Sequence, residues 1–116
     1  MNGDCNHALR RIRIEVRNGQ RQQVKTLAHE LAHAILHADR AELTRERCEL
    51  EAESVAFIVC AGLGLDTSEY SFGYLAVWAG GGEQARRGIA ESAQRIQTAA
   101  HRVLGAVTPG AEEVAA

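Results

Sequence analysis

The sequence has few aromatic residues and a single proline. Aromatic side chains make up 4% of its 116 residues, while hydrophobic residues make up 46% and charged residues 24%. This balance excludes a disordered chain, and the length fits one domain. Alanine is abundant, and small side chains let helices pack closely. We therefore expect one mostly helical domain over residues 1–116, with a core at about 10–104 and a flexible tail at 105–116.

A long apolar segment is also missing. No run approaches the roughly 20 residues that a membrane span requires, and the first ten residues lack the apolar region of a secretory signal. The three cysteines, Cys5, Cys48 and Cys60, form no CxxC pair. An odd number of unclustered cysteines indicates reduced thiols, so we expect a soluble cytoplasmic protein with no membrane partner. Cys60 lies in an apolar run and should be buried.

Neither sign of charge dominates. The 13 basic and 15 acidic side chains give a net charge of -2. Nucleic-acid-binding domains are usually basic. We therefore do not expect this domain alone to bind nucleic acid.

A strand is predicted near the N-terminus. Ile12, Ile14 and Val16 alternate with charged residues over residues 9–17, and Asn18-Gly19 follows as a turn. This period of two is typical of a half-buried strand. A single strand needs a partner, which the rest of the sequence hardly supplies.

Apolar residues at spacings of three and four predict helices in the rest of the chain. The helices are expected at about residues 22–38, 45–62 and 83–104, with a short one at 72–79. Their expected core positions are Val24, Leu27, Leu31, Ala34, Ile35, Leu50, Val55, Ile58, Val59, Ile89, Ala93, Ile96, Ala100 and Val103. Together with the strand, they predict an α+β fold.

The first of these helices carries His29-Glu30-Leu31-Ala32-His33. This HExxH pattern places two imidazoles one turn apart on one helical face, where they can hold one zinc ion. Glu30 would then lie beside the open coordination position. It could accept a proton from the attacking water and pass it to the leaving amine.

A catalytic zinc needs a third protein ligand. His37 lies a further turn along the helix, about 6 Å beyond His33, which is too far for the same ion. The next helix offers carboxylates: Glu51 shares a face with Val55, so it should point inward, and Glu53 lies on a neighbouring face. Helical phase favours Glu51 and leaves Glu53 as the alternative. The remaining acids, Glu49 among them, are expected to be solvated.

Four further residues are candidates for supporting roles. Tyr70 and Tyr74 follow the second helix, and either hydroxyl could stabilise the oxyanion of a tetrahedral intermediate. His37 and Glu53 could instead contact the metal ligands from behind. A set of two histidines and one glutamate suits Zn²⁺ best and also accommodates Mn²⁺.

Three separated segments resemble a known family. Residues 25–37 (KTLAHELAHAILH), 51–56 (EAESVA) and 64–72 (GLDTSEYSF) resemble, in order, the metallopeptidase domain of ArdC-like antirestriction proteins, which are relatives of the ImmA/IrrE metallopeptidases. The resemblance spans about residues 10–104. It implies a zincin-like α+β fold, with His29 and His33 as metal ligands, Glu30 as the catalytic residue and Glu51 as the third ligand.

The resemblance also implies a function. ImmA/IrrE members cleave helix-turn-helix repressors, so we expect a zinc metalloendopeptidase that hydrolyses a protein substrate such as a repressor. ArdC-like proteins belong to mobile elements and add an N-terminal domain that binds single-stranded DNA. No residues here match that domain, so DNA binding is not carried over. The alternative is a non-catalytic antirestriction or interaction module with a structural or vestigial metal site.

Overall fold

The computed structural model describes residues 2–39, 43–66 and 82–107. The described elements follow one another as β1 (Gly3–Asn6), β2 (Arg11–Ile14), α1 (Gln20–Leu36), α2 (Arg45–Gly62) and α4 (Gly82–Val107). The prediction of a mostly helical α+β protein with a small N-terminal strand element is confirmed.

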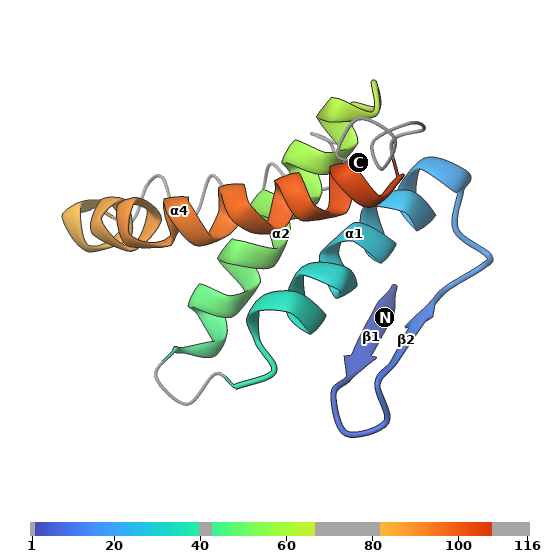
Figure 1. The fold of residues 1–116 in the computed structure, drawn as a ribbon, viewed down its shortest axis with the longest axis horizontal. Coiled ribbons are helices and arrows are strands. Elements are labelled where there is room, and N and C mark those ends of the chain that lie inside the picture. The colour runs from blue at the N-terminus through green and yellow to red at the C-terminus, as the bar shows by residue number, and fades with distance from the viewer. Residues whose placement is uncertain (1, 40–42, 67–81, 108–116) are drawn as a thin grey trace, which may run out of the picture.

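The three helices of the described residues pack directly on one another. α1 and α2 lie side by side and run in opposite directions, while α4 crosses both of them (Figure 1). The two strands lie against α1. As a result, the middle of α1, which carries the HExxH motif, lies between the strands on one side and α2 on the other.

Small side chains fill the centre of this helical packing. The cluster joins alanines and valines of all three helices and consists of Ala28, Ala32, Ala52, Val55, Ala56, Val59, Ile96, Ala99, Ala100 and Val103. Small residues at the contacts allow helix axes to approach closely. At Gly62 a Cβ atom would lie 3.0 Å from the Leu104 side chain. The C-terminal ends of α2 and α4 are therefore also close to each other.

The helix boundaries follow the sequence signals. Thr44 precedes α2, and its hydroxyl accepts a hydrogen bond from the Arg47 amide at 3.1 Å, as an N-cap residue does. α2 ends at Gly62, and Gly64 follows with a φ of 80°, a conformation that glycine adopts readily. The expected span of 45–62 is therefore confirmed for α2, and α4 extends slightly beyond its expected span.

The strand prediction was incomplete. β2 covers only Arg11–Ile14 and pairs antiparallel with β1, so that Gly3 lies opposite Ile14. The sequence GDCN of β1 contains no β-branched or aromatic residue, which is why sequence reasoning missed it. Val16, expected to be half-buried, is 72% exposed because β2 ends before it.

Several predicted core positions were wrong. Leu27 is 41% exposed and Ile58 is 38% exposed, and Ala34 is also exposed. The buried side of α1 instead carries Lys25, Thr26, Ala28, Glu30, Ala32 and His33. Ala28 and Ala32 belong to the core cluster, whereas Lys25 and His33 contact glutamates of α2. The prediction that Cys60 is buried is confirmed.

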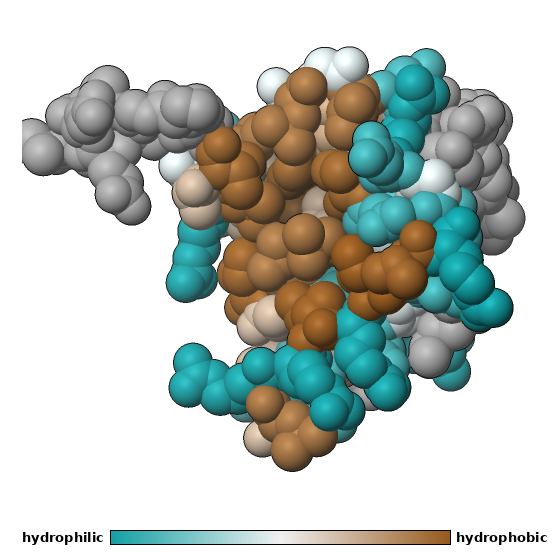
Figure 2. Space-filling view, turned by 90° about the vertical axis from the view of Figure 1, so that its right-hand side faces the viewer, coloured by the Kyte–Doolittle hydropathy of each residue, from teal (hydrophilic) through white to brown (hydrophobic). Residues whose placement is uncertain are grey.

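Other predictions fall on residues that are not described: the short helix at 72–79, Tyr70 and Tyr74. Within the described ranges, no helix combines the length and apolarity that crossing a bilayer requires. One side of the molecule nevertheless displays a broad apolar area bordered by polar side chains (Figure 2). Exposed apolar atoms are usual for a chain of this size.

Candidate metal centre

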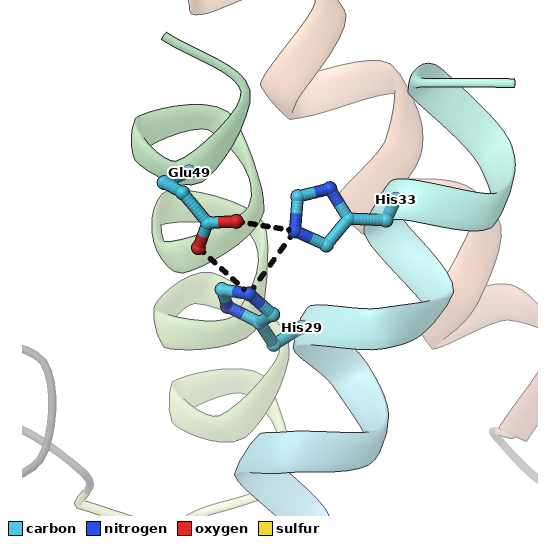
Figure 3. Close-up of side chains that lie close together, drawn as sticks. All are labelled: His29, His33 and Glu49. Carbon is cyan, nitrogen blue, oxygen red and sulfur yellow. Dashed lines mark hydrogen bonds and ion pairs between the residues drawn. The ribbon is translucent and has the colours of Figure 1, made fainter. Parts of the chain in front are cut away.

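Two histidines on α1 point the same way. His29 and His33 are four residues apart, and their Nε2 atoms are separated by 3.1 Å (Figure 3). Because 3.6 residues complete a helical turn, this spacing places both rings on one face of α1, one turn apart. His33 is buried and His29 half-buried. The arrangement predicted from the HExxH motif is therefore present.

A carboxylate of α2 completes a triangle with these rings. Glu49 Oε2 lies 3.2 Å from His29 Nε2, and Glu49 Oε1 lies 3.1 Å from His33 Nε2 (Figure 3). Ligand atoms at zinc distances of about 2.0–2.1 Å in a tetrahedron are about 3.3 Å apart. The spacing of the three donors therefore fits a single ion, and two imidazoles with one carboxylate suit zinc chemically.

His29 lies between two carboxylates. Glu49 faces its Nε2, while Glu53 Oε1 lies 2.7 Å from its Nδ1 and accepts a 2.7 Å hydrogen bond from Lys25 Nζ. Burial lowers the pKa of His29, but the hydrogen bonds with Glu49 and Glu53 outweigh burial and raise this pKa to about 9. The two carboxylates that flank His29 thus favour a positive charge on or beside its ring.

Glu30 lies beside the pair in a buried position. Burial raises the pKa of its carboxyl group, although the neighbouring His29 and His33 oppose this effect. A carboxylate with a raised pKa accepts a proton more readily near neutral pH, as a general base must. Glu30 also lines a cleft of about 440 Å³, which is bounded by Gly3, Asp4, Cys5, His7, His29, His33, Arg45 and Glu49.

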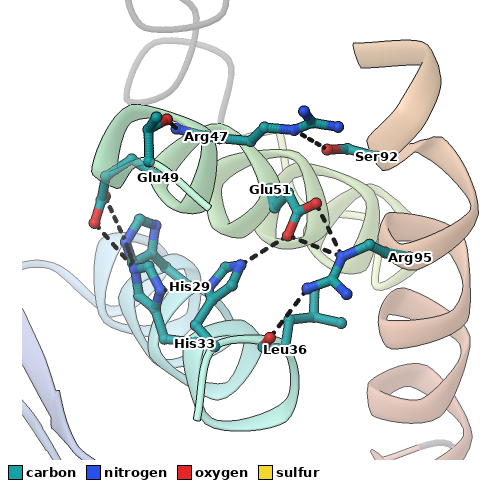
Figure 4. A network of polar contacts seen from close by, with 10 residues as sticks. His29, His33, Leu36, Arg47, Glu49, Glu51, Ser92 and Arg95 are labelled. Atoms are coloured by element: carbon teal, nitrogen blue, oxygen red, sulfur yellow. Dashed lines mark hydrogen bonds and ion pairs between the residues drawn. The ribbon is translucent and has the colours of Figure 1, made fainter. Parts of the chain in front are cut away.

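The structure separates Glu51 from the histidine pair. Its side chain is fully buried, as predicted, but its Oε1 lies 2.7 Å from His37 Nε2, and Arg95 donates to both of its oxygens at 3.1 and 3.3 Å (Figure 4). Burial raises the pKa of Glu51, yet hydrogen bonds from His37, Ser92 and Arg95 lower it to about 2. Glu51 therefore has partners of its own, and Glu49 takes the place beside the imidazoles.

The reason is the phase of α2. Each residue turns a helix by about 100°, so Glu49 and Glu53 share a side, while Glu51 points about 160° away. The side with Glu49 and Glu53 faces His29, and Glu51 faces α4. The expectation of a solvated Glu49 was wrong, since this side chain is only 36% exposed and contacts both rings.

The supporting candidates have different outcomes. Glu53 contacts His29, the histidine nearest to it. His37 is 1% exposed, and its Nδ1 lies 2.8 Å from His33 Nδ1. Sequence reasoning missed Lys25 and Arg95, which form ion pairs with the buried Glu53 and Glu51 respectively. The i, i+4 spacing of Glu49 and Glu53, matching that of the histidines, was a signal for this facing arrangement.

Two imidazoles and a carboxylate from neighbouring helices, with a buried glutamate beside them, define a candidate His₂Glu metal site on a mostly helical domain. The model of the IrrE N-terminal-like domain family, Peptidase_M78, matches residues 2–61, and the chain belongs to this family. The matched residues contain all three candidate ligands and Glu30.

An uncharacterized protein of Bacillus anthracis is 40% identical to this chain over 74 residues. The match covers 62% of this chain and 13% of that protein, so the chain spans a small part of its relative. No solved structure matches the chain.

Proposed function

We propose that the chain is a zinc-dependent metalloendopeptidase domain of the ImmA/IrrE type. The observation that carries this proposal is the triangle of His29, His33 and Glu49 at 3.1–3.2 Å separations, with Glu30 beside it in a cleft. The Peptidase_M78 family supports the same reading. Zn²⁺ is the preferred ion, and Mn²⁺ fits the same ligands less well.

The proposed reaction is hydrolysis of a peptide bond. A zinc ion held by His29, His33 and Glu49 would supply Lewis-acid chemistry: it would polarise the substrate carbonyl and make water a stronger nucleophile at neutral pH. Glu30 accepts the proton of the attacking water, a step that the raised pKa of its carboxyl group favours. It then transfers this proton to the leaving amine. Glu53 and Lys25 hold the ring of His29 from behind.

The proposed substrate is a protein segment in an extended conformation. β1 contributes Gly3, Asp4 and Cys5 to the wall of the cleft, and within the described residues it pairs only with β2. An extended peptide could add to the other edge of β1 and so present its backbone to the site. The ImmA/IrrE relationship suggests a helix-turn-helix repressor as the substrate.

The test combines zinc content with peptide cleavage. The wild-type protein should bind one zinc ion by mass spectrometry and cleave members of a proteome-derived peptide library. Glu30→Gln should keep the zinc and reduce cleavage by about 10²–10⁴-fold, the typical contribution of a general base. His33→Ala should lose the zinc.

Two results would decide against the proposal. A wild-type protein that takes up no zinc or manganese would remove its basis. The second result is a zinc-loaded wild type that cleaves nothing in the library, together with a Glu30→Gln variant that has the same zinc content and the same lack of cleavage. This result would favour the non-catalytic antirestriction or interaction module instead.

A further inference from the structure

We propose that His37, Glu51 and Arg95 form a positioning chain that holds His33 in the ring orientation and tautomer required of a metal ligand. This inference rests on the proposed metal site. None of the three side chains lies in the triangle formed by His29, His33 and Glu49. The positioning chain starts at His37, which contacts His33 of α1, and passes through Glu51 of α2 to Arg95 of α4. Figure 4 labels its last two members, Glu51 and Arg95.

The first link is between two histidines. The Nδ1 atoms of His33 and His37 are 2.8 Å apart, and both side chains are buried. A neutral imidazole that offers the lone pair of Nε2 to a metal must carry its hydrogen on Nδ1. His33 Nδ1 therefore donates, and His37 Nδ1 accepts.

This polarity determines the next link. With Nδ1 of His37 accepting, the hydrogen of this neutral ring must be on Nε2. Its Nε2 lies 2.7 Å from Glu51 Oε1, so it donates to the carboxylate. A carboxylate at this position accepts only, which excludes the reverse order of hydrogens while Glu51 is ionised. With a metal on His33 Nε2 and Glu51 ionised, the hydrogens therefore have one arrangement: His33 Nδ1 donates to His37 Nδ1, and His37 Nε2 donates to Glu51.

Arg95 completes the positioning chain. Its Nε donates to both oxygens of Glu51, at 3.1 and 3.3 Å, and keeps the buried carboxylate charged. Its Nη2 also donates to the Leu36 carbonyl at 3.0 Å, at the last residue of α1. One guanidinium therefore fixes Glu51 on α2 and the end of α1 at the same time. A charged group with several N–H donors in fixed positions is well suited to this role.

The two metal histidines are then held in different ways. Glu53 contacts His29 directly at 2.7 Å, whereas Glu51 acts on His33 through His37. Ligating histidines usually give their second ring nitrogen to such a partner, and loss of the partner typically weakens metal binding 10–100-fold. His37 explains how Glu51 can serve this purpose from a position that is too far for direct contact.

The test measures metal affinity. His37→Phe keeps a ring in place and removes both hydrogen bonds, and Arg95→Met removes the guanidinium from a side chain that is 43% exposed. We expect zinc dissociation constants, determined by competition with a chelator, to rise by about 10–100-fold for His37→Phe and to rise also for Arg95→Met. The visible absorption of bound Co²⁺ should change in both variants.

Arg47→Met is the matched control. Arg47 also joins α2 to α4, through a 2.9 Å ion pair with Glu91 and a 3.1 Å hydrogen bond to Ser92. Arg47 reaches Glu51 only indirectly, through Ser92, so this variant should change zinc affinity and the Co²⁺ spectrum much less than Arg95→Met does. The melting temperature of each metal-free variant separates loss of metal affinity from loss of fold.

The outcomes distinguish this inference from the proposed function. A wild type that binds no metal contradicts the proposed function. A wild type that binds zinc, together with folded His37→Phe and Arg95→Met variants that bind it equally well, overturns the positioning chain and leaves the metal site intact. Equal weakening by Arg47→Met would also overturn it, because any α2–α4 contact would then suffice.

Discussion

Three glutamates at alternate positions of α2 have three different surroundings. Glu49 faces the imidazole pair, Glu51 contacts His37 and Arg95, and Glu53 contacts His29 and Lys25. Burial alone does not identify the partner of a side chain. Helical phase correctly predicted that Glu51 points inward, but three helices meet here, and the sequence does not show which neighbour covers which side of α2.

The first consequence concerns the third ligand. Glu49→Gln should weaken zinc binding more than Glu51→Gln, because the first replaces the proposed carboxylate ligand with a neutral amide and the second alters only the support of His33. Chelator competition on both variants measures the difference. If Glu51→Gln abolished binding while Glu49→Gln preserved it, Glu51 would be the ligand that the sequence favoured.

At the scale of elements, the helices were predictable and the strand pairing was not. The period of the apolar residues located α1, α2 and α4 to within a few residues. β1 escaped because Gly3 and Asp4 are poor strand formers, and its place depends on contact with β2 and α1. The apolar side of α1 was assigned only in part. Leu31 and Ile35 pack against the core cluster as predicted, whereas Leu27 and Ala34 are exposed.

The contact between β1 and α1 is tight at Gly3. A Cβ atom there would lie 2.6 Å from the Arg13 carbonyl oxygen and 2.7 Å from Thr26 Cγ2. Gly3→Ala must therefore move β1 away from its neighbours, and we expect a loss of about 1–3 kcal/mol of unfolding free energy, as in overpacked cores. Denaturant titration of the metal-free protein measures it.

Gly105→Ala is the control for Gly3→Ala. Gly105 lies in α4, and a Cβ atom there would meet nothing within 4 Å. Alanine is the better helix former, so this variant should be more stable by about 0.5–1 kcal/mol. A Gly3→Ala variant as stable as the wild type would show that β1 does not pack closely on α1.

At the scale of the whole molecule, the apolar core is small. Its buried cluster contains mainly alanine and valine. Among the described residues, six acidic or basic side chains are buried around it: Lys25, Glu30, His33, His37, Glu51 and Glu53. Domains of about this size often depend on a bound metal or partner for part of their stability. A metal that joins α1 to α2 would add to the stability of the folded state.

Chelation should therefore lower the melting temperature of the wild type. Zinc at 1,000 times its dissociation constant stabilises a folded protein by about 4 kcal/mol. For a domain of this length this corresponds to roughly 10–20 °C. Scanning calorimetry with zinc and with a chelator should show this difference for the wild type and none for His33→Ala. Equal shifts in both proteins would mean that zinc binds elsewhere.

The candidate ligands all lie between His29 and Glu49, a stretch short enough to be grafted onto another helical protein. Such a graft would leave behind α4, whose Ile96, Ala99, Ala100 and Val103 belong to the core cluster and whose Arg95 neutralises Glu51. A recipient scaffold would have to provide its own third helix, with an apolar stripe and a guanidinium in the corresponding place. Copying only the HExxH motif and Glu49 would transfer the candidate donor atoms without the side chains that orient them.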